Sequence, residues 1–126
     1  MRTNFIILAV LIFTIGVAWI GTHAIDSFCV TQLETLRETQ NAIMANDWEN
    51  AQFKSDSIKN SVMSSRSWIT ILINQRMLNE IEILAERMHV SIQMQDQLSS
   101  LSELVSLKSY LEEVRSDTFI TITNLL

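Results

Sequence analysis

The chain has 126 residues and a net charge of −5, with no proline and only two glycines, Gly16 and Gly21. Hairpin turns of β-sheet proteins depend on glycine, asparagine-glycine and proline, so this composition argues against a sheet and favours long helices. Lysine and arginine are interspersed with acidic residues. Without a basic cluster we expect no nucleic acid as a partner.

The N-terminal stretch Phe5 to Ile25 reads FIILAVLIFTIGVAWIGTHAI and has no fixed charge. As a helix it would be about 30 Å long, which matches the hydrocarbon core of a bilayer. We therefore predict that residues 5–25 contact the lipid bilayer as a single span. Arg2 precedes the span and Asp26 follows it, so the positive-inside tendency predicts a cytoplasmic N-terminus and an extracytoplasmic C-terminal domain.

Two alternatives to a simple anchor remain open at this stage. Thr22-His23-Ala24 loosely fits the cleavage site of a secretory signal peptide, although the apolar stretch is long for a signal core. Thr14, Ala18 and Thr22 form a stripe of small residues, a pattern that lets membrane helices approach closely but that also arises by chance. Self-association therefore stays open, and we divide the chain into an anchor, 1–25, and a helical domain, 26–126.

The first predicted helix after the span runs from Asp26 to Ala45 and can continue the membrane helix without a break. Its expected apolar stripe comprises Val30, Leu33, Leu36 and Ile43. Asn46 to Glu49 resembles a capping box, with Asn46 as the N-cap and Glu49 three residues later. We therefore expect a second helix to begin here.

The second helix carries a seam at steps of three and four residues, which is typical of an antiparallel bundle. Its members are Trp48, Ala51, Ser55, Ile58, Val62, Ser65, Ile69 and Leu72. Two polar segments, 64–67 and 73–76, are candidates for its end, and we favour the second.

A third helix is predicted from the stripe Met77, Ile81, Leu84, Met88 and Ile92, with a turn at 93–97. The last predicted helix carries Leu98, Leu101, Leu104, Val105, Leu107, Leu111 and Val114. For the tail, 119–126, we expect either an extended segment or a short final helix. The fold class is thus all-α: an N-terminal transmembrane helix followed by an antiparallel bundle of about four helices.

Residues with catalytic or ligand-binding chemistry are sparse. Glu86 and His89 have the spacing of half a di-iron site, but a complete site needs further ligands, so we expect both on a solvated face and predict no metal. No Gly-x-Ser-x-Gly elbow or glycine-rich phosphate loop is present, and we predict no cofactor and no enzymatic activity.

Cys29, the single cysteine, has no partner for an intramolecular disulfide; it is either a buried hydrophobe or a link between two chains. Trp48 and Trp68 are the proposed structural anchors.

Several segments together resemble a family of uncharacterised small membrane proteins, a domain of unknown function found mainly in spore-forming Gram-positive bacteria. These are the N-terminal span, Asn46-Asp47-Trp48-Glu49-Asn50-Ala51, Trp68, Leu78-Asn79-Glu80-Ile81-Glu82-Ile83-Leu84-Ala85-Glu86-Arg87, Glu103-Leu104-Val105-Ser106-Leu107-Lys108 and Thr123-Asn124-Leu125-Leu126. The family often has a histidine just before the Leu78 segment, where this chain reads Asn74-Gln75-Arg76. The resemblance implies no assigned activity.

The residues and the resemblance together favour a membrane-anchored, non-catalytic accessory of another membrane or envelope protein. The alternative is an extracytoplasmic sensor that holds a small apolar molecule between its helices.

Overall fold

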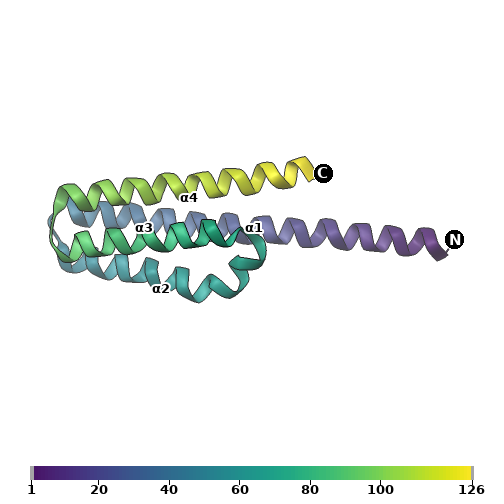
Figure 1. Ribbon diagram of the computed structural model, residues 1–126, viewed down its shortest axis with the longest axis horizontal. Helices are drawn as coiled ribbons and strands as arrows, with labels where there is room; N and C mark the ends of the chain where they lie inside the picture. Colours follow the sequence, from purple (N-terminus) through teal and green to yellow (C-terminus); the bar gives the residue numbers. More distant parts are fainter. Residues whose placement is uncertain (1, 126) are drawn as a thin grey trace.

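Four helices make up residues 2–125 of the computed structural model, which describes the backbone of this range and the side chains of residues 2–117. They are α1 (Arg2–Met44), α2 (Trp48–Leu72), α3 (Gln75–Gln93) and α4 (Gln97–Leu125). Each helix packs against the next in the sequence, and α4 also packs along α1, so the four close into an antiparallel bundle (Figure 1). The predicted all-α class and the antiparallel bundle of four helices are confirmed.

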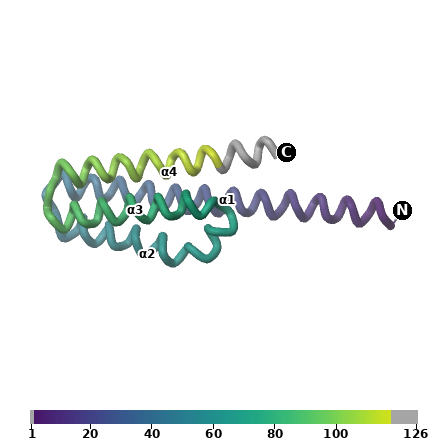
Figure 2. The backbone as a smooth tube through the Cα atoms, viewed as in Figure 1, coloured from purple at the N-terminus to yellow at the C-terminus, as the bar shows by residue number. Residues whose placement is uncertain are grey.

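Helix α1 is the longest element, at 43 residues, and spans about 65 Å at 1.5 Å per residue. Its N-terminal half projects alone beyond the bundle, whereas its C-terminal half is one of the four packed helices (Figure 2). The first buried residue is Gly21 and the next is Ile25. The helix passes through residues 25 and 26 without a break. The division of the chain into an anchor, 1–25, and a helical domain, 26–126, stays a prediction.

Of the helices that the structure describes, α1 alone is long and apolar enough to cross a membrane. The other helices cover almost none of its apolar stretch. A soluble core helix of this length would instead be buried. Both a membrane span and a signal sequence have these properties at an N-terminus.

The turn between α1 and α2 corrects the predicted capping box. Asn46 adopts the left-handed conformation, with φ of 57°, and ends α1 instead of beginning α2. The N–H of Asn46 donates to the Ile43 carbonyl and that of Asp47 to the Ala42 carbonyl, at 3.1 and 2.9 Å, which is a Schellman motif. The N-cap is Asp47, whose side chain accepts from the Asn50 N–H at 3.3 Å. Asparagine is common both at the left-handed position that ends a helix and at the N-cap that begins one. The spacing of residues alone could not tell which of these roles Asn46 has.

The same construction ends α3 and begins α4, within the predicted turn at 93–97. Gln95 is left-handed, with φ of 54°, and the N–H of Asp96 donates to the Ser91 carbonyl at 3.2 Å. The Asp96 side chain then accepts from the Ser99 N–H at 3.1 Å. An aspartate directly after a left-handed residue thus closes one helix and begins the next at both turns of this end of the bundle.

Gln95 offers a direct test of this turn geometry. A left-handed conformation costs a residue with a Cβ about 1–2 kcal/mol, and glycine avoids this cost while losing part of the gain to its greater freedom in the unfolded chain. Gln95→Gly should therefore raise the free energy of unfolding by roughly 1 kcal/mol, measured by guanidinium unfolding of the full chain in detergent micelles. Asn46→Gly is the matched control and should gain less, because asparagine already tolerates this conformation. An equal or larger gain for Asn46→Gly would contradict this account.

The turn between α2 and α3 lies at the opposite end of the bundle. α2 ends at Leu72, and Asn74 caps α3 by accepting from the Arg76 N–H at 2.8 Å. The prediction that the second helix ends near 73–76 is confirmed, and the serine-rich segment 64–67 lies inside α2. In the tail, α4 continues to Leu125 in a single helix, so the extended alternative is wrong; the side chains of 118–126 lie outside the described residues.

The core contains most of the predicted stripes of α2, α3 and α4, although Leu72 of α2 and Leu98 and Val105 of α4 are exposed. In α1 the predicted stripe is partly wrong, because Val30 is 43% exposed and the buried face includes Gln32 and Thr39. The Gln32 amide donates to the Ser61 hydroxyl at 2.6 Å, and the Thr39 hydroxyl donates to the Thr35 carbonyl at 2.7 Å. Because these polar groups have partners, their burial is tolerated.

Candidate functional site

A polar cluster in the core joins α2 to α3. His89 of α3 is buried, and its Nδ1 lies 3.0 Å from the Oγ of Ser55, which is also buried. Its Nε2 lies 3.5 Å from the Oδ1 of Asp56, whose side chain is exposed. The expectation that His89 stands on a solvated face is therefore wrong. The ring is held between a buried hydroxyl and a carboxylate at the rim.

This cluster has the residue types of a catalytic triad but a different arrangement. In a triad the nucleophilic serine faces Nε2 and the aspartate faces Nδ1, whereas here the two contacts are reversed. The Ser55 hydroxyl is fully buried, so no substrate carbonyl can reach it. What the cluster does is fix α2 against α3 by satisfying the polar groups of both.

The Glu86 carboxylate makes its ion pair outside this cluster. It pairs with Lys59 of α2 at 2.7 Å, and the hydrogen bond from Lys59 is the main cause of a lowered pKa of Glu86. Glu86 and His89 are therefore committed to different partners. Within the described part of the chain, no group of three histidine, cysteine, aspartate or glutamate side chains could hold a metal ion.

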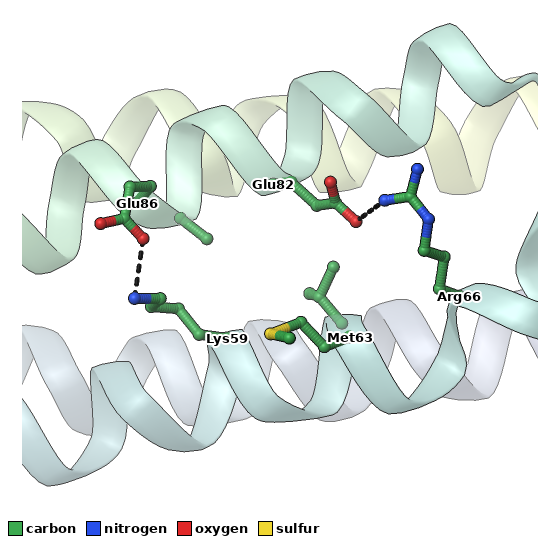
Figure 3. Close-up of a pocket in the computed structure, with 7 residues that line it drawn as sticks. Lys59, Met63, Arg66, Glu82 and Glu86 are labelled. Atoms are coloured by element: carbon green, nitrogen blue, oxygen red, sulfur yellow. Dashed lines mark hydrogen bonds and ion pairs between the residues drawn. The ribbon is translucent and has the colours of Figure 1, made fainter.

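A surface groove of about 330 Å³ lies between α2 and α3 (Figure 3). The ion pair between Lys59 and Glu86 crosses one end, and an ion pair between Arg66 and Glu82 crosses the other. The residues between the two ion pairs are apolar: Val62, Met63 and Ala85. Met63 is 67% exposed although it is a large apolar side chain. The groove thus combines an apolar centre with charged ends.

The register of the two antiparallel helices produces this pattern. Lys59 and Arg66 are seven residues apart, which places them on one face of α2 two turns apart. Glu82 and Glu86 are four residues apart on one face of α3. Because the helices run in opposite directions, the earlier base meets the later acid. Two such interhelical pairs at the surface contribute modestly to stability but fix which faces of α2 and α3 meet.

A family model, the domain of unknown function DUF4363, matches residues 19–125, which include nearly all of the bundle. The chain belongs to this family. No curated protein and no solved structure matched the chain. The match begins at Trp19, so most of the exposed apolar part of α1 lies outside the DUF4363 domain and the whole of α2 and α3 lies within it.

Within the DUF4363 domain, Trp48 and Trp68 lie at opposite ends of α2, about 30 Å apart along the helix. Each is half-buried and packs against the apolar core. Trp68 meets Phe28 of α1 edge to face, with ring centroids 6.1 Å apart and an interplanar angle of 87°. At this separation the two tryptophans cannot line one pocket.

The groove of this DUF4363 protein was not predicted from the sequence, which had marked Glu86 only as half of a metal site and Val62 only as a member of the packing seam. The seven-residue spacing of Lys59 and Arg66 and the four-residue spacing of Glu82 and Glu86 were visible. Such spacings are common on solvated helices, however, and their meaning depends on which helix faces which. A pattern of bases on one predicted helix and acids on the next could have suggested the pairing once an antiparallel hairpin was assumed.

Proposed function

We propose that this protein is a membrane-anchored, non-catalytic accessory that presents its helical bundle to another membrane or envelope protein. The observation that carries the proposal is the continuity of α1, in which an exposed apolar stretch leads directly into the buried face of the bundle. A bundle joined to its anchor by an unbroken helix has a restricted orientation at the membrane surface. Tethering also raises the effective concentration of partners in the same membrane, so weak contacts suffice.

The position of the charges supports an orientation with the N-terminus in the cytoplasm and the bundle outside it. Arg2 precedes the apolar stretch, whereas Asp26 is the first charged residue after it. The assignment to spore-forming Gram-positive bacteria rests on the resemblance alone and stays a prediction.

The groove between α2 and α3 is the surface that we assign to the partner. Its apolar centre, with Met63 largely exposed, suits the apolar side chains of a helix or loop, and Lys59, Arg66, Glu82 and Glu86 offer charges of both signs at the ends. Docking of this kind buries apolar surface and exchanges surface ion pairs for contacts with the partner. A sensor of small apolar molecules would use a more enclosed cavity between the helices, and the open, charge-flanked groove favours the accessory.

Photo-cross-linking in native membranes tests this proposal. A photoreactive amino acid in place of Met63 should cross-link a discrete membrane or envelope protein, which mass spectrometry would identify. The matched control carries the same amino acid at Phe53, which lies on the same helix outside the groove and is 68% exposed against 67% for Met63. The two positions are almost equally exposed, so a difference in cross-linking between them reports on their location.

The proposal predicts a partner at position 63 and none at position 53. Equal cross-linking from both positions would show that the groove is not the contact surface. Cross-links from position 63 only to further copies of this chain would replace the accessory role with self-association. If no protein is captured and a small apolar molecule raises the melting temperature of the full chain, the sensor is the better reading.

A further inference from the structure

The turn between α2 and α3 lies beside α1 at the point where α1 leaves the bundle (Figure 1). Gly21 marks the contact: a Cβ at this position would lie 2.9 Å from Cδ2 of Leu72. The absence of a side chain at Gly21 therefore allows Leu72 to approach the backbone of α1 closely. Because the exposed apolar stretch ends at this level, the turn stands where the bundle meets the end of the proposed span.

The side chains at this turn are unusual for a surface in water. Ile71 is 83% exposed and Leu72 is 39% exposed. Between residues 67 and 79 the only charged residue is Arg76, which is exposed. On α1, Trp19 is exposed and stacks on His23 with ring centroids 6.1 Å apart. Apolar side chains, a tryptophan and a basic residue at one level are the combination that bilayer interfaces favour.

Helix α4 also packs along α1. An ion pair between Arg115 and Asp26 sets α4 beside α1 just above the end of the span. From there α4 continues to Leu125, and the sequence contains no charged residue from 118 to 126.

We propose that the end of α2, where it turns into α3, inserts Ile71 and Leu72 into the interfacial region of the bilayer that α1 crosses. The bundle then has two contacts with lipid, the span and this turn, and cannot swing freely about α1. Burial of Ile71 among lipid headgroups and upper acyl chains removes from water an apolar side chain that the fold leaves uncovered. The inference rests on the proposed span, because the turn reaches lipid only if α1 crosses the membrane.

An environment-sensitive fluorophore on single cysteines tests the contact. The full chain would be reconstituted in vesicles of phosphatidylcholine and phosphatidylglycerol and labelled at Ile71→Cys, Leu98→Cys or Ile12→Cys. Leu98 is the matched control, since it is 81% exposed, also apolar, and lies at the opposite end of the bundle. Ile12 reports on the span itself. The native Cys29 is fully buried, so the unsubstituted chain should take up little dye.

The expected result is a blue-shifted emission at position 71 and several-fold stronger quenching by lipids that carry a nitroxide near the headgroup than at position 98. Position 12 should be quenched by nitroxides near the end of the acyl chain. If position 12 is quenched and position 71 behaves like position 98, the interfacial contact is wrong and the span stands. If position 12 is not quenched, both the membrane span and the interfacial contact are wrong. A blue shift at position 71 without quenching by lipid would show that a second copy of the chain covers Ile71, which also overturns the proposal.

Discussion

Replacement of Trp68 by alanine should lower the free energy of unfolding by about 3 kcal/mol. Truncation of a large aromatic side chain in a core costs about 3–5 kcal/mol, and the partial exposure of Trp68 places it at the lower end of this range. The loss has two sources: the apolar contacts of the indole with the core, and the edge-to-face contact with Phe28 of α1. Guanidinium unfolding of the full chain in detergent micelles, followed by far-ultraviolet circular dichroism, measures the change.

Two further variants show whether the ring contact matters in itself. Trp68→Phe keeps an aromatic ring opposite Phe28 and should lose clearly less than Trp68→Ala. Trp48→Ala should also destabilise, by about 1–2 kcal/mol, because Trp48 is half-buried at the first residue of α2 and has no partner ring among the described residues. Unchanged stability of Trp48→Ala would remove Trp48 as a structural anchor. Equal losses for Trp68→Ala and Trp68→Phe would remove the role of the ring contact.

The stability of the bundle should fall between pH 9 and pH 11 through the ionisation of Cys29. Burial is the main cause that raises the pKa of this thiol to about 11 from an ordinary value of 9.0; the charge of Asp26 adds to the rise and that of Arg115 opposes it. Below pH 9 the thiol is protonated in both states and its contribution is fully present. Between pH 9 and pH 11 the unfolded chain loses the proton and the folded chain keeps it, so unfolding becomes easier. The expected loss is about 2–3 kcal/mol.

Cys29→Ala isolates this effect from the titration of lysines and of Tyr110, whose pKa is also raised, chiefly by burial. The variant should be less stable at neutral pH, because it loses a buried sulfur, but its stability should decline much less between pH 9 and pH 11. Parallel pH profiles for the two chains would contradict the assignment to Cys29. The same burial bears on the alternative of a disulfide between two chains: the bundle would have to open before Cys29 could reach a second thiol.

Much of the architecture followed from local features of the sequence. The lack of glycine and proline after residue 21 left few ways to end a helix, and the apolar spacing of α2 and α3 placed Ile58, Val62, Ile81 and Met88 on their buried faces. The turn at 73–76 was correctly predicted from its polarity. These features depend on residues within a few positions of one another, which is why a sequence reveals them.

Two errors in sequence-based assignment arose at polar residues that can take either of two roles. Asn46 and Asp47 are both good caps, and only the backbone shows that Asn46 ends α1 and Asp47 begins α2. His89 was placed on a solvated face because a metal site there lacked further ligands, yet it is buried against Ser55. The partner that makes burial of His89 tolerable comes from another helix, and such a partner is known only after the helices are packed.

The sequence by itself determined the all-helical class, the apolar N-terminal stretch and most of the helix boundaries, because these properties are set by composition and by contacts three or four residues apart. Tertiary structure alone decided which polar residues enter the core, how the bases of α2 meet the acids of α3 around a groove, and that Leu72 stands beside Gly21 at the end of the apolar stretch. Each of these depends on the register between helices far apart in the chain. That register is fixed by the packing of the whole core and is not encoded in any one segment.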